Sequence, residues 1–406
     1  MGLITGGLNG RRFRIREPLP PGFRDLFLEQ VRSHTFVEAP DAADDEPRIG
    51  WVGIFDPANT DIQLNDLLVD RTVSLTMRAD TKRVQSAYLK IATAQRIADV
   101  CAERGVERLS KADQEAVSDA IRSELLQRAV PTVATTDFAW DIHTGEAVVF
   151  STSETTLEHA RQLIRDTFGV HIAPERTVDW LDDKLGRDEV DARLSGFVQG
   201  APSPGDDPLE GHELLLGSDF LTWLWLQSES SDGLFRVIDG GAAKQAALER
   251  LQPDEGTDDE WNDITETLRH ADLTLWIDSK LKLRDLLNDD PSTTILLGAA
   301  PSTSPEARQT LHEGKRPIEA QLGVRLGDIE CMMTLIATHA GVQIAGLKLP
   351  STVKSRDEAR LIERWALLEL VHTTVRQLFQ QFFQARTSPA WRERVDRWMR
   401  EGLEAA

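Results

Sequence analysis

The stretch from Leu67 to Leu181 decides the fold, because strand and helix signals follow one another there in a definite order. It opens with LLVDRTVSLTMRAD (67–80), whose β-branched residues and partial alternation predict a strand over Leu67–Arg78. Apolar residues at helical spacing then predict helices over 82–103 and 111–128. Two helices joined by a short glycine-containing loop predict a helical hairpin that projects from a sheet.

The same stretch continues with TTDFAWDIHTGEAVVFST (135–152) and ETTLEHARQLIRDTFG (154–169). The first segment predicts two strands around a turn at His143–Glu146, in which Gly145 supplies a backbone position with positive φ. The second segment predicts an amphipathic helix. No residue of this stretch belongs to an obvious catalytic pattern, so the order of its elements is more informative than its side chains.

On either side of this stretch the patterns predict further strands and helices. We expect strands over 3–16, 49–55 and 273–283, a helix over Phe23–Ser33, and a buried helix that contains DFLTWLWLQSES (219–230). A final long helix over 357–385 would measure about 40 Å at 1.5 Å per residue. The predicted class is α+β, with mixed or antiparallel sheets, the projecting hairpin and the long C-terminal helix.

Composition shifts predict how the chain divides. We expect a central sheet domain in two parts, a hairpin between them, an inserted or diverged α+β region and a C-terminal base region: 1–81 and 129–198, 82–128, 199–304, and 305–406. Residues 41–47 and 253–263 are strongly acidic and are predicted to be solvated loops, and 199–210 has the composition of a linker.

The charge and the apolar content exclude several classes of protein. The 406 residues carry a formal net charge of −21, which argues against a protein that covers nucleic acid with its whole surface but not against a local basic lining. No apolar run reaches the length of about 20 residues that a membrane span needs, and the N-terminus lacks a secretory signal, so we expect a cytoplasmic protein. Cys101 and Cys331 lie in apolar contexts and are expected to be buried free thiols.

A search for enzymatic motifs is largely negative, and no cofactor is predicted. Gly314-Lys315 is followed by Arg316 and lacks the earlier glycine of a phosphate-binding loop. The sequence contains no G-x-S-x-G elbow and no H-E-x-x-H pair. Carboxylates are abundant, so composition leaves a metal-dependent nuclease open as an alternative.

Basic residues form four local clusters that are candidates for phosphate contacts. Strand alternation places Arg12 and Arg14 on one face of the first strand, and it places Lys280 and Lys282 together on a later one. The eight candidates are Arg12, Arg14, Arg78, Lys82, Lys280, Lys282, Lys315 and Arg316. The competing interpretation for each cluster is a solvated sheet face held by salt bridges, or, for Lys315 and Arg316, charges that favour the C-terminus of a helix.

The order IGWV, RADTKRV, LLQRAV, TTDFAWDI, ETTLEHARQLIRDTFG and VDWL resembles the RdgC family of recombination-associated proteins. A second match, LHEGKRPIEAQLGV (311–324) followed by DIECMMTL and GVQIAGLKLP, resembles the closing segment of that family. The resemblance covers roughly 1–190 and 305–385. Residues 199–304 lie where typical members are shorter, and Val130 stands where an aromatic residue often follows Arg-Ala.

The resemblance implies a homodimeric ring whose central hole admits double-stranded DNA with little sequence preference. It also implies a nucleoid-associated protein that restrains RecA-driven strand exchange by occupying DNA, without catalysis or cofactor. Only Lys315 is carried over from the family's Gly-Lys motif; the other seven candidates come from charge patterning. The alternatives are a protein-interaction scaffold of the same fold that has lost DNA binding, and the nuclease.

Overall fold

The structure is a computed structural model that describes most of the chain. The described residues are 2–4, 6–17, 19, 22–39, 46–69, 72–181, 210–230, 235–236, 240–251, 262–286, 292–298, 301–350, 358–388 and 390–404. They form two compact units: unit 1 contains Met1–Arg16, Asp141–Thr152 and Ile172–Ala406, and unit 2 contains Glu17–Trp140 and Ser153–His171. The strands of each described ladder pair antiparallel, and helices accompany them, which confirms the α+β class.

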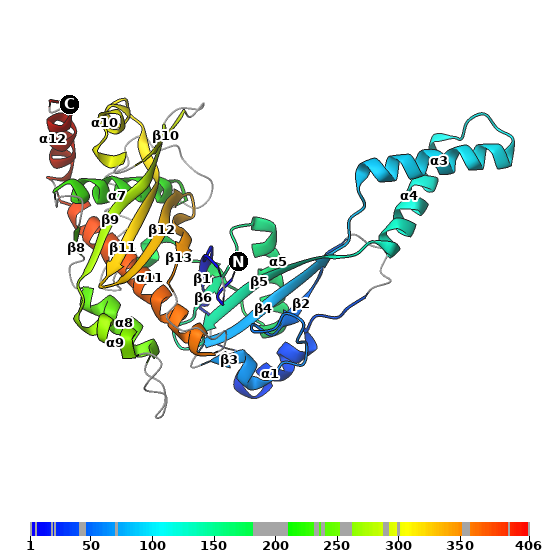
Figure 1. The fold of residues 1–406 in the computed structure, drawn as a ribbon, viewed down its shortest axis with the longest axis horizontal. Coiled ribbons are helices and arrows are strands. Elements are labelled where there is room, and N and C mark those ends of the chain that lie inside the picture. Colours follow the sequence, from blue (N-terminus) through cyan, green and yellow to red (C-terminus); the bar gives the residue numbers. More distant parts are fainter. Residues whose placement is uncertain are drawn as a thin grey trace. The chain divides into compact units, whose positions relative to one another are not determined.

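Unit 2 is built on a sheet whose strands are β2 (Arg48–Val52), β3 (Leu68–Val69), β4 (Thr72–Thr81) and β5 (Thr132–Asp141). β4 pairs with β2 and β3, and β5 lies next to β4 (Figure 1). The helices α1 (Phe23–Ser33), α2 (Leu64–Leu67) and α5 (Glu154–Phe168) belong to the same unit. The strand expected over 67–78 is therefore two strands, and the expected bounds of α1 are confirmed.

An aromatic core holds unit 2 together. The ring of Trp51 lies 5.8 Å from that of Phe138 and 6.3 Å from that of Phe168. The indole Nε1 of Trp51 donates to the hydroxyl of Thr167 at 2.8 Å, so its polar atom is satisfied inside the core. These contacts join α5 to β2 and β5.

The helices α3 (Ser86–Arg104) and α4 (Lys111–Arg128) lie between β4 and β5 in the chain and contact each other. Figure 1 shows both beyond the ends of those strands. The hydroxyl of Ser110 caps α4 by accepting from the backbone N–H of Asp113 at 3.1 Å. Val117, Ile121 and Leu125 lie at helical spacing on α4, but their side chains are only half-buried, because two helices packed on each other shield only one side of each.

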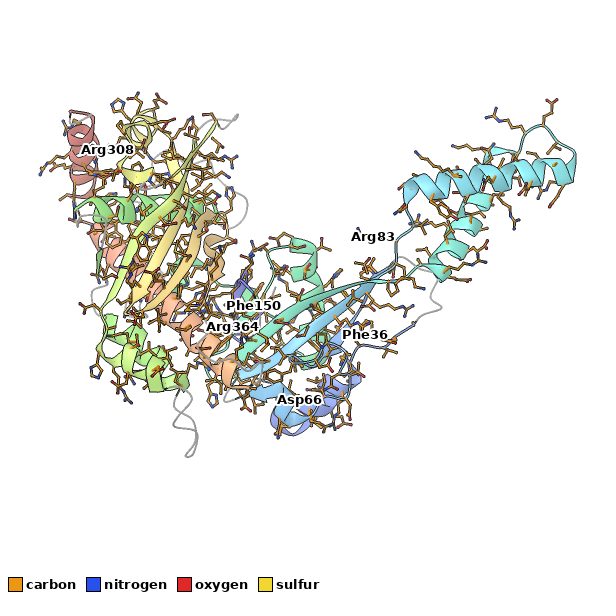
Figure 2. The ribbon with its side chains drawn as sticks, viewed as in Figure 1. Phe36, Asp66, Arg83, Phe150, Arg308 and Arg364 are labelled. Atoms are coloured by element: carbon orange, nitrogen blue, oxygen red, sulfur yellow. The ribbon has the colours of Figure 1, made fainter. Side chains whose placement is uncertain are left out.

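Three short strands of unit 1 bring distant segments together. The strand β1 (Arg11–Arg14) pairs on one side with β6 (Glu146–Val149) and on the other with β7 (Ala173–Pro174). The strand expected over 3–16 is shorter, because the backbone before β1 is held in another way: the Arg364 guanidinium donates to the carbonyls of Leu3 at 2.6 Å and Gly6 at 2.7 Å. Figure 2 labels Arg364 among the side chains.

A six-stranded sheet is the largest part of unit 1. Its order is β10-β9-β11-β12-β13, with β8 on β9. The strands are β8 (Phe235–Arg236), β9 (Leu273–Arg284), β10 (Thr293–Leu297), β11 (Arg316–Leu326), β12 (Ile329–Thr338) and β13 (Gly341–Lys348). The helix α7 (Glu210–Ser230) packs on β11, β12 and β13, and buries Trp223 and Trp225, as predicted for this segment.

The other helices of unit 1 complete this core. The helix α11 (Glu358–Arg386) packs on α7 and α8, and its 29 residues span about 44 Å. The remaining elements are α8 (Gly240–Leu251), α9 (Asn262–His270), α10 (Pro305–His312), α12 (Trp391–Glu404), and the 3-10 turns η1 (Thr177–Trp180) and η2 (Pro301–Thr303). In the described part of the chain, no helix is long and apolar enough to cross a membrane.

Some expectations fall on residues outside the described ranges, namely 41–45, 199–209 and 253–261. The expected domain boundaries stay a prediction. Of the two thiols, Cys331 is buried as expected, and burial raises its pKa to about 12, whereas Cys101 is only half-buried.

Candidate nucleic-acid interface

The strand β9 presents cations on the face of the six-stranded sheet opposite its apolar core. Leu281 and Leu283 point into the core and are fully buried, whereas the side chains of Lys280 and Lys282 are 34% and 31% exposed. Arg284, two positions further on, is exposed. The alternation predicted from the sequence is therefore confirmed, and we call this side of the sheet the open face.

Strand pairing brings a second pair of cations to the same end of the sheet. Arg316, the first residue of β11, lies directly opposite Arg284 in the antiparallel register. Lys315 precedes it, and its Nζ donates to the hydroxyl of Thr294 on β10 at 2.8 Å. The two basic clusters, about 30 positions apart in the sequence, thus become neighbours. We call Lys280, Lys282, Arg284, Lys315 and Arg316 together the basic end.

One carboxylate, Glu319 of β11, lies among these cations. It accepts from Lys280 at 2.5 Å and lies 3.9 Å from Lys282, which is its partner in the register. Arg284, Lys315 and Arg316 form no ion pair with another described residue. Glu319 is thus the carboxylate that contacts Lys280 and Lys282, and the remaining positive charge leaves the basic end suited to phosphate groups.

One contact supports the competing interpretation for Arg316. Its Nη1 lies 3.5 Å from the carbonyl oxygen of Leu311 in the last turn of α10, where a cation favours the helix dipole. Gly314 lies between that helix and Lys315 with φ of 97°, so the Gly-Lys pair forms the turn from α10 into β11. Arg316 thus has a local role in addition to its place at the basic end.

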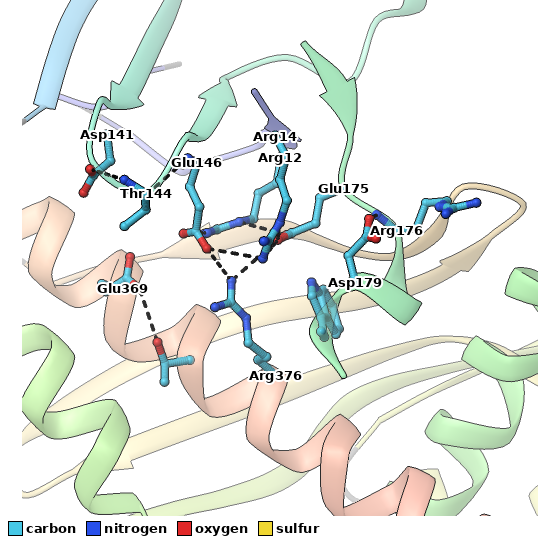
Figure 3. A network of polar contacts seen from close by, with 12 residues as sticks. Arg12, Arg14, Asp141, Thr144, Glu146, Glu175, Arg176, Asp179, Glu369 and Arg376 are labelled. Carbon is cyan, nitrogen blue, oxygen red and sulfur yellow. Dashed lines mark hydrogen bonds and ion pairs between the residues drawn. The ribbon is translucent and has the colours of Figure 1, made fainter. Parts of the chain in front are cut away.

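Arg12 and Arg14 of β1 lie in a different setting, a network of ion pairs in unit 1 (Figure 3). Arg12 contacts Glu146 at 2.5 Å and Glu175 at 3.1 Å, and Arg14 contacts Glu175 at 3.1 Å and Glu146 at 3.5 Å. Arg376 of α11 approaches the same two carboxylates, at 2.9 Å and 3.5 Å. The side chains of Arg12 and Glu175 are only 9% and 2% exposed, so this network, which we call the β1 network, is largely shielded from solvent.

Proton affinities in the β1 network reflect these pairs. Burial alone would raise the pKa of Glu146, but Arg12 and Arg376 outweigh it and lower that pKa to about 2. Burial opposes ionisation of Arg12, yet Glu146 and Glu175 raise its pKa above the ordinary value. Burial, with the charges of Arg12 and Arg376, lowers the pKa of His372 well below its usual range, so this imidazole is neutral.

Arg78 and Lys82 belong to unit 2 and line a cavity of about 280 Å³. Nε and Nη2 of Arg78 donate to the carboxylate of Asp80 at 2.9 and 2.8 Å. The Arg78 guanidinium lies 4.2 Å from the centre of the Phe36 ring. Lys82 is buried, and its Nζ donates to the carbonyl of Gln127 at 3.2 Å. Val130, on the rim of this cavity between α4 and β5, is exposed.

The eight candidates are therefore distributed over three places, and the basic end unites Lys280, Lys282, Lys315 and Arg316. The eight candidates leave out Arg284, although its alternation with Leu283 places it on the same strand face as Lys280 and Lys282. Sequence analysis also missed Glu146, Glu175 and Arg376, for which no local pattern exists. In the described part of the chain, no group of three or more His, Cys, Asp or Glu residues is placed to hold a metal ion.

Comparison with known families gives a match over part of the chain. The family model described as "RdgC: Putative exonuclease, RdgC" matches residues 9–181, a range that begins just before β1 and ends just after η1. No curated protein matches the chain. The residues of the basic end lie outside the matched range.

Proposed function

We propose that the chain, whose residues 9–181 match the RdgC family model, is a divergent and longer member of that family and binds double-stranded DNA without sequence preference in a recombination-related role. The observation that carries the proposal is the basic end, where two clusters from separate parts of the chain meet at one end of the six-stranded sheet, with Arg316 directly opposite Arg284. Lysine and arginine side chains on a sheet can neutralise phosphates without reading base edges, which gives binding without sequence preference.

The strongly negative total charge is compatible with this proposal because binding depends on local charge. With a net charge of −21, most of the surface repels a phosphate backbone, so DNA is directed to the places where cations gather. Each phosphate contact releases counterions, and the logarithm of the binding constant falls by about 0.9 per contact for each tenfold rise in salt. Binding through the basic end should therefore weaken steeply with salt.

We further propose that two copies form a ring around DNA, with α3 and α4 as one place of contact between them. The helix α3 buries none of its side chains, and both Tyr88 and Ile91 are 57% exposed on it. Exposed apolar groups on one helix favour burial against another protein surface. A ring that occupies DNA would restrain RecA-type strand exchange by excluding the filament, which needs no catalytic group.

A salt titration with charge-reversal variants tests the DNA-binding proposal. Binding of a labelled duplex to the full chain is measured by fluorescence anisotropy from about 20 mM to 300 mM salt. We expect that Lys282→Glu with Arg284→Glu, and separately Lys315→Glu with Arg316→Glu, each weaken binding by at least tenfold at low salt and reduce the salt slope by about 2.

The matched control places the same two charge reversals elsewhere in unit 1. Arg394 and Arg397 are exposed on α12, so Arg394→Glu with Arg397→Glu changes the net charge equally. We expect this control to alter binding less than threefold. A wild type that shows no salt-sensitive binding would contradict the basic end as the interface. An equal loss of binding in all three variants, the control included, would contradict it as well.

The same preparations discriminate the two alternatives. A scaffold that has lost DNA binding would show no salt-sensitive binding at all. The family description names an exonuclease. A nuclease would shorten linear DNA in the presence of Mg²⁺ or Mn²⁺, and gel electrophoresis would show the shortened DNA.

A further inference from the structure

The strand β10 lies at the edge of the six-stranded sheet, and no described strand pairs with its outer side. Among the residues of this sheet whose burial the structure describes, it carries the two large apolar side chains that are exposed, Ile295 at 53% and Leu297 at 74%. Edge strands in natural proteins are usually protected by charges, prolines or a covering segment. Thr293–Leu297 (TTILL) contains neither a charge nor a proline, so this edge is open to pairing.

Hydrogen bonds at both ends of β10 show which backbone groups face the free edge. The carbonyl of Ser292 accepts from the N–H of Asp285 at 3.1 Å, and the N–H of Gly298 donates to the carbonyl of Ser279 at 3.0 Å. In an antiparallel ladder every second residue turns its N–H and C=O toward the same neighbour. The even-numbered residues therefore face β9, and Thr293, Ile295 and Leu297 direct their backbone groups outward.

The same three residues also place their side chains on the open face. In the register of β10 and β9, Thr293 lies opposite Arg284, Ile295 opposite Lys282, and Leu297 opposite Lys280. Residues opposite each other in a ladder share a face of the sheet. The free edge thus combines unpaired backbone groups with exposed apolar side chains, next to the cations of β9.

We propose that β10 pairs antiparallel with β10 of a second copy of this chain, about a twofold axis that passes through Ile295. Ile295 then faces the same residue of the second copy, and Thr293 faces Leu297. About six backbone hydrogen bonds form between the copies, and no charge is placed opposite another charge within the paired strands. The seam gives the proposed ring an interface distinct from α3 and α4, so this inference deepens the proposed function and rests on it.

A second copy fits this edge better than an unrelated peptide, because the pairing makes the DNA surface continuous. The strands β9 and β10 and their two counterparts extend the open face across both copies. The two β9 strands would lie three strand spacings apart, about 14 Å. Two rows of cations at that separation are comparable to the major groove, about 12 Å wide, and face one duplex from the same side.

Cysteine crosslinking tests both the seam and its register. Ile295→Cys is made in a Cys101→Ser background, with the buried Cys331 retained. The Cα atoms of residue 295 in the two copies would face each other across the axis at about 5.5 Å, within disulfide range. Mild oxidation should therefore give a covalent dimer. Thr294→Cys faces Leu296 of the second copy and should not crosslink to itself. A mixture of Thr293→Cys chains and Leu297→Cys chains should crosslink to each other.

A second experiment measures the energy of the seam without cysteine. Ile295→Lys with Leu297→Lys should raise the dimer dissociation constant at least about tenfold in analytical ultracentrifugation, since lysine on an edge strand prevents pairing. Val37→Lys, which changes an exposed valine of unit 2 in the same way, should leave it unchanged.

The inference is overturned by a wild type that stays monomeric or by equal crosslinking of Ile295→Cys and Thr294→Cys. It is also overturned if Ile295→Lys with Leu297→Lys leaves the dimer dissociation constant unchanged. DNA binding of the wild type is titrated in parallel. Salt-sensitive DNA binding without the seam would reject this inference alone. A seam that forms as described without any DNA binding would reject the proposed function alone.

Discussion

The β1 network and the basic end begin from the same sequence pattern and give opposite surroundings. In both, cations alternate with apolar residues along a strand: Arg12 and Arg14 around Phe13, and Lys280 and Lys282 around Leu281. At β1 two glutamates and a third arginine from distant segments enclose the cations. At β9 a single glutamate contacts two lysines whose side chains are about one third exposed. Alternation thus determines the face of a strand, whereas the residues that lie opposite determine whether the charge is available to a ligand.

The strongest test of this comparison removes one carboxylate from each region. Glu175→Ala should lower the free energy of unfolding by about 3–5 kcal/mol, because Arg12 would be left largely buried with an incomplete set of partners. Glu319→Ala should cost no more than about 1 kcal/mol, since the lysines it contacts are about one third exposed. Urea denaturation followed by circular dichroism measures both. Equal losses would show that the two regions do not differ in the way described.

The β1 network also predicts acid sensitivity. The pKa of Glu146 is lowered from 4.5 to about 2, so the folded protein binds fewer protons than the unfolded chain between these values. Its contribution, on the order of 3 kcal/mol, is complete above pH 4.5 and is lost as the pH falls toward 2. Urea midpoints between pH 3 and 6 should fall with pH in the wild type. In Glu146→Gln, that part of the slope should be absent.

Glu213 of α7 provides the opposite case, a buried carboxyl outside the β1 network. Burial raises its pKa from 4.5 to about 7, although hydrogen bonds from Thr177 and Val178 act against this, and Oε2 has no hydrogen-bond partner among the described residues. The folded state therefore binds more protons than the unfolded chain between pH 4.5 and 7. Stability should fall by up to about 3 kcal/mol as the pH rises through that range.

Glu213→Gln isolates this effect. The variant keeps the shape of the side chain, and its urea midpoint between pH 5 and 8 should be less dependent on pH than that of the wild type. A wild-type midpoint that increases steadily from pH 5 to 8 would show that Glu213 is ionised in the folded protein.

The smallest expected effect concerns DNA affinity at the basic end. Glu319→Gln removes the negative charge beside Lys280 and Lys282 while keeping a hydrogen-bonding group. We expect duplex binding to tighten by about threefold at low salt, an effect of the size that one partly exposed ion pair contributes. Glu330→Gln on the same sheet removes the carboxylate that Arg325 contacts at 2.6 Å and serves as the control, with a smaller gain. Weaker binding in Glu319→Gln would mean that Glu319 positions the lysines instead of competing with phosphate.

Local signals predicted the elements well and the contacts between them poorly. The bounds of α4 follow from periodicity and the Ser110 cap, and the burial of Leu281 and Leu283 follows from alternation. The pairing of Arg284 with Arg316 depends on the strand order of the six-stranded sheet, which periodicity does not encode. The contact of Arg12 with Glu175 joins residues that no local window contains, and for this reason Arg12 was a candidate phosphate contact without its carboxylates being foreseen.

The hydrogen bonds from Arg364 to Leu3 and Gly6 affect the order in which the chain can fold during its synthesis. The two bonded groups Arg364 and Leu3 are separated by 361 positions. At a synthesis rate of roughly 5–20 residues per second, the first segment waits on the order of 20–70 s at the ribosome before α11 emerges. Unit 2, built mainly from 17–140 and 153–171, can acquire its core in that interval. We therefore expect the nascent N-terminal segment, with Phe13 still uncovered, to depend on chaperones until translation is nearly finished.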